Sequence, residues 1–139
     1  MIFENDKDLE REKEAITLFV SVFGGSFKKL DPLDIDYKIF DKDGKLIAYA
    51  EVKGRKRNIR NAYPLPISAA KVTKLAAKRL APVLVWACDD GIIYGNANKL
   101  EGTIKWGGRE PRPGAVNDSE IMVYYDKQKE LKYVRYPWL

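Results

Sequence analysis

The sequence predicts a single α/β domain, residues 1–139, in which a mixed central sheet is flanked by helices. Three observations support this class. Apolar residues recur at helical spacing near the N-terminus, alternating segments flank an Asp-Gly turn, and a second helical segment precedes a nearly continuous apolar strand. A length of 139 residues suits one domain with a core of its own.

The first predicted element is a helix over residues 3–23, with Gly24 and Gly25 as its stop. Glu12 lies on the apolar stripe of this helix, three residues after Leu9 and four before Ile16. This position predicts a carboxylate that faces inward. The alternative is a glutamate at the edge of the stripe that reaches solvent or pairs with a lysine. The apolar side chains that form the stripe are Leu9, Ile16, Phe19, Val20 and Phe23.

Two strands are predicted next, over residues 35–40 and 45–53, around the two-residue turn Asp43-Gly44. This turn would place Lys38 opposite Tyr49, and it would likewise pair Phe40 with Ile47 and Asp36 with Glu51. One face of the hairpin is apolar and resembles a core: Ile35, Tyr37, Ile39, Leu46, Ala48, Ala50 and Val52.

The other face carries Asp34, Asp36, Glu51 and Lys53 at the open end of the hairpin. Because directly opposed carboxylates repel each other, Asp36 and Glu51 imply a shared proton or a bound cation. Their oxygens, with the main-chain carbonyl of Val52, suit Mg²⁺, for which Mn²⁺ is the expected substitute. Lys53 could orient or help deprotonate a water there. The alternative is an ion network on an exposed sheet face.

The Glu-x-Lys triplet is not diagnostic by itself, because the sequence contains a second one, Glu130-Leu131-Lys132. That triplet follows a polar turn at residues 127–129, where charges are ordinarily solvated. Glu51 instead follows apolar and small residues and is predicted to face an acid. Position, and not the triplet, therefore distinguishes the two.

The remaining elements complete the predicted sheet. Residues 67–80 predict a second helix with Ser68 as its N-cap, and Lys71, Lys74 and Lys78 align on one side of it. Two hairpins are expected after this helix, with a strand at residues 103–106 that continues the sheet and a loop at 107–119 between them. The hairpin strands span residues 83–88 and 92–95, and residues 121–125 and 131–136.

Basic residues concentrate between residues 51 and 80, where nine of them accompany a single acid, Glu51. A basic face around one carboxylate predicts a polyanionic partner, with DNA as the first candidate. The alternative is a solvated surface rich in lysine. The expected DNA contacts are Arg55, Lys56, Arg57, Arg60, Lys71, Lys74 and Lys78.

Composition excludes several classes of site. The chain has no histidine and one cysteine, Cys88, so a zinc site, a histidine base and an internal disulfide are excluded. No apolar run is long enough for a membrane span, and the acidic N-terminus is unlike a secretory signal. We therefore expect a soluble protein that stays in the cytoplasm. Its small size and basic face fit a prokaryotic or phage-infected cell.

Asp36 and the segment Glu51-Val52-Lys53, followed by Gly54-Arg55 and preceded by a helix with Glu12, resemble the PD-(D/E)xK nuclease superfamily. Its members include type II restriction enzymes, Holliday-junction resolvases and small phage nucleases. The resemblance spans about residues 9–95 and implies a restriction-endonuclease-like core of order α-β-β-β-α-β. Residues 96–139 are then a C-terminal elaboration built on a β-hairpin.

The resemblance also implies residue roles. Asp36 and Glu51 would be metal ligands, Lys53 the catalytic lysine and Glu12 a supporting metal ligand, while Lys71 would lie near the phosphates. The match departs from the superfamily pattern at two points. The helix after the motif lacks the glutamine-tyrosine signature of the helicase-associated exonucleases, and Pro32 precedes Leu33 and Asp34 and not Asp36. Asp34 therefore remains a rival ligand, which a bulge in the hairpin would favour.

We expect a Mg²⁺-dependent DNA endonuclease that hydrolyses phosphodiester bonds. The narrower expectation is selectivity for branched or four-way DNA. The resemblance also implies a possible homodimer, because dimers are common among such relatives, which must cut two strands. The alternative is a non-catalytic nucleic-acid-binding module that keeps the fold while its acids sit in ion pairs. The complete Asp-Glu-Lys set favours the enzyme, since a module that only binds has no chemical need for it.

Overall fold

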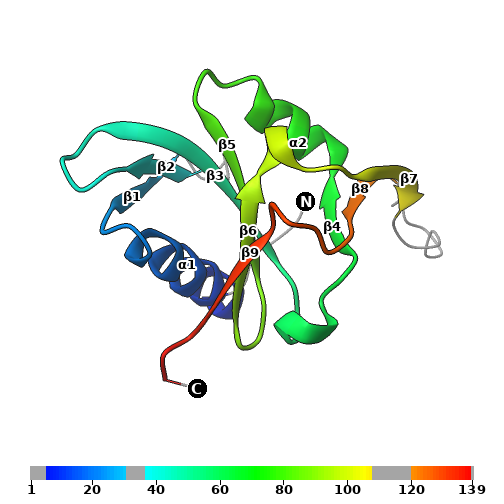
Figure 1. Cartoon of the computed structure of the whole chain (residues 1–139), viewed down its shortest axis with the longest axis horizontal. Helices are drawn as coiled ribbons and strands as arrows, with labels where there is room; N and C mark the ends of the chain where they lie inside the picture. The colour runs from blue at the N-terminus through cyan, green and yellow to red at the C-terminus, as the bar shows by residue number, and fades with distance from the viewer. Residues whose placement is uncertain (1–5, 31–36, 108–119, 139) are drawn as a thin grey trace.

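The computed structural model describes residues 6–30, 37–107 and 120–138 (Figure 1). Its elements, in chain order, are α1 (Asp6–Ser21), β1 (Ser26–Lys29), β2 (Tyr37–Phe40), β3 (Leu46–Gly54), the short 3₁₀ helix η1 (Ile59–Asn61), β4 (Leu65–Ser68), α2 (Ala69–Ala76), β5 (Ala81–Ala87), β6 (Gly91–Asn96), a second 3₁₀ helix η2 (Ala97–Lys99), β7 (Thr103–Gly107), β8 (Glu120–Tyr125) and β9 (Lys132–Arg135).

A six-stranded mixed sheet forms the centre of the fold, in the order β1-β2-β3-β5-β6-β9. β3 and β5 are parallel, and every other neighbouring pair in this sheet is antiparallel. The parallel pair requires a crossover connection, which contains β4 and α2. The predicted α/β class with a mixed central sheet is confirmed.

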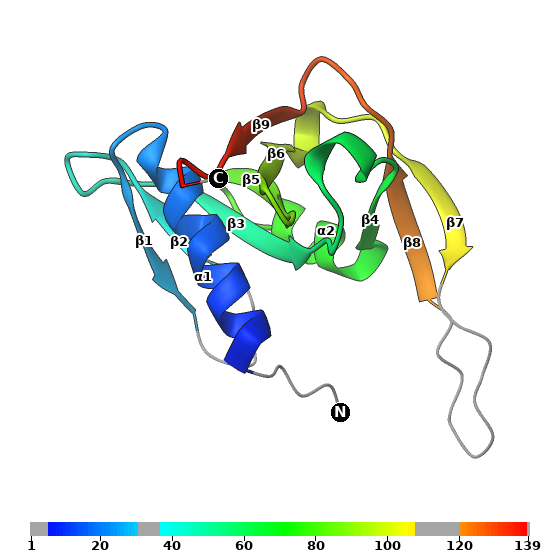
Figure 2. The same cartoon turned by 90° about the horizontal axis from the view of Figure 1, so that it is seen from below.

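The two faces of the central sheet bury different partners. α1 covers one face, where Ile16 and Phe19 pack with Ala50 and Val85. α2 and a smaller sheet of order β4-β8-β7 cover the other face, where Leu75 packs with Trp86 (Figures 1 and 2). Because side chains alternate along a strand, Tyr49 and Glu51 of β3 face α2, whereas Ala48, Ala50 and Val52 face α1.

The hairpin of β2 and β3 follows the predicted register at Lys38 and Tyr49. The predicted two-residue turn is wrong, however, because Asp41 N donates to Lys45 O at 2.8 Å and a longer turn results. Gly44 takes a φ of 81° in this turn, and a register shift follows, so Phe40 pairs with Leu46 and not with Ile47. The predicted pairing of Asp36 with Glu51 lies outside the described residues, as does Asp34.

Both predicted helices are shorter in the structure. α1 ends at Ser21, before Phe23, and residues 1–5 lie outside the described part of the chain. The second helix begins at Ala69, because Leu65 and Ile67 are buried as alternate residues of β4. Ser68 is its N-cap residue, but the Ser68 side chain makes no capping hydrogen bond.

The later strands were predicted with partly wrong partners. The hairpin of β5 and β6 is confirmed. The last predicted hairpin is wrong, because β8 pairs with β4 and β7 while β9 pairs with β6. β7 lies in the small sheet and does not continue the central one, and β1 was not predicted. Alternation identifies a strand but carries no information about its partner.

Among the described residues, neither helix has the length and apolar character needed to cross a lipid bilayer.

Trp86 connects the two sheets, and we expect its replacement by phenylalanine to lower the free energy of unfolding. The indole is fully buried, donates from Nε1 to Pro66 O at 2.9 Å and packs edge-on against Tyr125. Losing that hydrogen bond and leaving a cavity should cost about 2–4 kcal/mol in urea denaturation. Trp106→Phe is the matched control, because Trp106 is 73% exposed. Equal losses in the two variants would contradict the assignment.

Cys88 is buried directly after β5, and burial, aided by the nearby Asp90, raises the pKa of its thiol to about 12. Because the thiolate is the reactive form, we expect negligible reaction with an aromatic disulfide reagent at pH 8 in the native protein. Reaction should be complete within minutes in urea. Rapid labelling of the native protein would contradict this prediction.

The free energy of unfolding should also decline as the pH rises from about 9 toward 12, because only the thiol of the unfolded chain then ionises freely.

Candidate functional site

The candidate site lies at the carboxyl end of β3. The described pairing of β2 with β3 reaches Tyr37 and Ala50, whereas β5 continues beside β3 as far as Gly54. A pocket of about 340 Å³ lies at this end of the strand. α1, the end of β3, the segment after it and α2 all contribute to its lining, through residues that include Arg11, Glu12, Val52, Lys53, Lys56 and Lys71.

Glu51 is the most unusual residue of the site, because its side chain is only 1% exposed. It lies on the α2 side of β3 and neighbours Leu84 of β5, which is also buried. The ammonium of Lys71, from the first turn of α2, is 3.5 Å from Glu51 Oε1. A carboxylate in such a place is stable as an anion only with positive charge nearby. Glu51 therefore does not lie on an exposed sheet face.

Glu12, on α1, lines the pocket itself, as does Lys71, the partner of Glu51. Its residue exposure is 8%, which confirms the predicted inward orientation. Its carboxylate also pairs with a lysine, since Lys29 Nζ on β1 is 3.5 Å from Glu12 Oε1. The two carboxylates thus each have an ammonium group at the same distance.

Lys53 follows Glu51 by two residues, lines the pocket and is half-buried. Burial lowers the pKa of its ammonium group, and the positive charge of Lys71 lowers it further. Glu120 and Glu51 act in the opposite direction, but they do not reverse the shift. Lys53 therefore loses its proton more readily than an ordinary surface lysine, so more of it is in the neutral form that can accept a proton from water. When protonated, it lies where an anionic ligand in the pocket would meet its charge.

A hard divalent cation fits the chemistry of these donors. Mg²⁺ is bound in proteins by one or two carboxylates, with waters completing its shell. A nearly fully buried Glu51 and an inward-facing Glu12 are carboxylates of that kind. Within the described residues no three acidic, histidine or cysteine side chains form a metal cluster. Asp34 and Asp36 lie outside the described residues.

The residues predicted to contact DNA lie in several different places. Lys56 and Lys71 line the pocket, while Arg57 and Lys74 are exposed. Others lie elsewhere or make structural contacts. Arg55 donates from Nε to Ala62 O at 2.9 Å and from Nη2 to Pro64 O at 3.3 Å, and so it fastens the segment after β3.

The last two predicted contacts point away from the pocket. The Lys78 ammonium lies 4.7 Å from the centre of the Tyr49 ring, toward the other end of β3. Arg60 lines a different pocket, which also contains Tyr133. The sequence therefore predicted more basic groups at the site than the structure places there.

Sequence reasoning missed Asp8, Arg11 and Lys29. Asp8 and Arg11 line the pocket from α1, and Arg11 Nη1 also pairs with Asp89 Oδ1 at 2.9 Å. Asp8 could have been found, because it precedes Glu12 by four residues and so shares a face of the helix. Lys29 could not, because its strand β1 was not predicted.

Comparison with known proteins adds one finding. Residues 1–132 match a family described as "Phage putative PDDEXK endonuclease". No curated protein and no solved structure matches the chain significantly. The family match covers nearly the whole chain and includes the helix with Glu12 and the strand with Glu51 and Lys53. The chain therefore belongs to this phage family of the PD-(D/E)xK nuclease superfamily.

Proposed function

We propose that the protein is a divalent-metal-dependent DNA endonuclease that hydrolyses phosphodiester bonds, with Mg²⁺ as its ion and Mn²⁺ as a substitute. The observation that carries this proposal is a carboxylate, Glu51, buried to 1% exposure, whose ion-pair partner Lys71 lines the same pocket as Lys53. Family membership supports nuclease chemistry. It also favours an enzyme over a module that only binds nucleic acid.

The proposed ligands are Asp36, Glu51 and the main-chain carbonyl of Val52, with Glu12 in support and Asp34 as the rival to Asp36. When bound, the ion supplies an acidified water and stabilises the charge that develops on the phosphate. Glu51 and Glu12 would hold it by their carboxylate oxygens. Lys53 orients the attacking water, accepts its proton and offsets negative charge near the phosphate, and its lowered pKa supports the role of acceptor.

The proposed DNA contacts are sequence-independent. Lys56 and Lys71 line the pocket, and Arg57 and Lys74 are exposed cations of the same basic region. Such groups bind the phosphate backbone and make affinity sensitive to salt. Selectivity for branched DNA and a homodimeric state are narrower parts of the proposal. A panel of linear, single-stranded, flapped and four-way DNA tests the first, and light scattering tests the second.

Lys53→Met should abolish cleavage of this panel in Mg²⁺, with a loss of about 100-fold or more, since proton transfer by a positioned side chain contributes that much. DNA binding, measured by fluorescence anisotropy, should change by much less. Lys132→Met is the matched control, because Lys132 is the exposed lysine of the second Glu-x-Lys triplet. Cleavage of no DNA by the wild type, or equal cleavage by Lys53→Met, would overturn the proposal.

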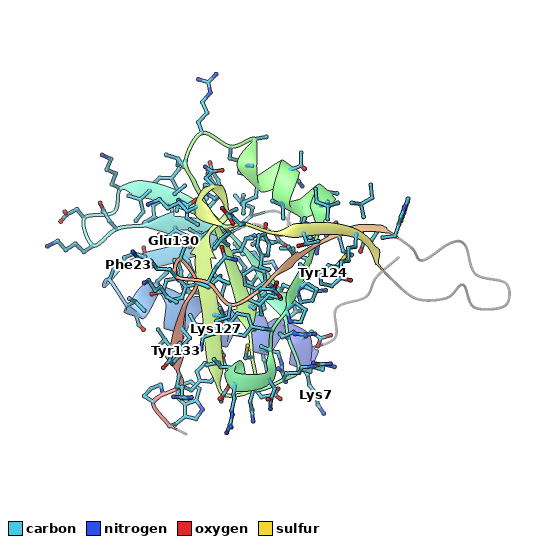
Figure 3. The ribbon with its side chains drawn as sticks, turned by 45° about the vertical axis from the view of Figure 1, so that its right-hand side comes forward. Lys7, Phe23, Tyr124, Lys127, Glu130 and Tyr133 are labelled. Atoms are coloured by element: carbon cyan, nitrogen blue, oxygen red, sulfur yellow. The ribbon has the colours of Figure 1, made fainter. Side chains whose placement is uncertain are left out.

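Glu51→Gln should remove stabilisation by divalent metal, because it exchanges a charged ligand for a neutral amide of similar shape. Wild type should gain about 2.7 kcal/mol at a metal concentration of 100 Kd, seen as a rise in Tm. Glu130→Gln should keep this gain. Glu130 belongs to the second triplet, and Figure 3 places it far from Lys7 in the first turn of α1, the helix that lines the pocket. An unchanged gain in Glu51→Gln would argue against Glu51 as a ligand.

A further inference from the structure

The contact between Lys71 and Glu51 links two elements of different character. Glu51 is 1% exposed and belongs to the central sheet, whereas 41% of the Lys71 side chain is exposed on α2. The 3.5 Å between Nζ and Oε1 exceeds the 2.7–2.9 Å typical of a strong charge-assisted hydrogen bond. The ammonium group is therefore close enough to neutralise Glu51, yet it is only loosely held.

A divalent cation and an ammonium group compete for the same buried anion. Both are attracted to the carboxylate, but at separations of a few ångströms they repel each other, and the repulsion is stronger in a poorly solvated site than in water. Of the two groups, Lys71 can leave. Its side chain has an open path to solvent, while Glu51 is fixed within a strand paired on the β5 side.

We infer that Lys71 is a placeholder cation: it neutralises Glu51 in the metal-free protein and is displaced when a divalent ion binds there. This inference rests on the proposed function. On this inference Lys71 has two effects: it stabilises the metal-free protein, and it weakens the affinity for metal. The displaced ammonium group stays at the pocket that it lines, beside Lys53 and Lys56, where it adds positive charge for a phosphate.

A different role for Lys71 predicts the opposite result. If Lys71 served to orient Glu51 as a ligand, then removing Lys71 would weaken metal binding, because a disordered carboxylate binds less well. The metal affinity of the Lys71 variant, measured in the absence of DNA, therefore distinguishes a lysine that competes with metal from one that positions Glu51. It does so without any measurement of cleavage.

The experiment titrates Mn²⁺ and Mg²⁺ into the full-length, metal-free protein by calorimetry. Lys71→Met should bind metal about 10-fold more tightly than wild type, and its Tm without metal should fall by several degrees. Lys42→Met is the control. It removes the same charge, but Lys42 is exposed in the turn at the opposite end of β3. Its metal affinity should stay within twofold of wild type.

Lys71→Arg provides a second test that does not depend on the stability of Lys71→Met. A guanidinium group can pair with a carboxylate through two hydrogen bonds and is harder to displace. Metal affinity should therefore fall severalfold. Equal or weaker binding by Lys71→Met, or tighter binding by Lys71→Arg, would overturn the inference alone. Absence of metal binding and of cleavage in wild type would overturn the proposed function as well.

Discussion

The buried carboxylate of Glu51 is the constraint on which the rest of the site depends. An ionised group with 1% exposure must be compensated by positive charge, or it will take up a proton. Lys71 from α2 provides that charge at 3.5 Å, and Lys53 from the same strand lies nearby. The arrangement explains why basic groups gather at this end of β3, since the buried carboxylate attracts positive charge.

The architecture holds these groups in place through the parallel pair of β3 and β5. The pairing continues to the end of β3, where Lys53 neighbours the fully buried Trp86. Trp86 in turn binds the small sheet through Pro66 O and Tyr125. Because α2 is part of the crossover between the two parallel strands, the connection that builds the sheet also brings Lys71 to Glu51.

Local sequence patterns were sufficient to predict several of the helices and strands. The Asp-Gly turn and the alternation around it identified β2 and β3, and apolar spacing identified α1 with Glu12 on its inner face. The errors occurred where tertiary pairing overrides local preference. Residues 67 and 68 were predicted as the start of a helix but are held in β4 by β8. β8 and β9 join different sheets although both alternate.

The sequence by itself determined the fold class, the placement of Glu51 and Lys53 on one face of a strand, and the excess of basic residues after them, because these depend on spacing and composition. Only the tertiary structure decided which cations reach Glu51. Lys71 pairs with it, whereas Arg55 binds backbone carbonyls and Lys78 lies over Tyr49. The physical reason is that burial and distance set the strength of a charge interaction, and both depend on packing between segments far apart in the chain.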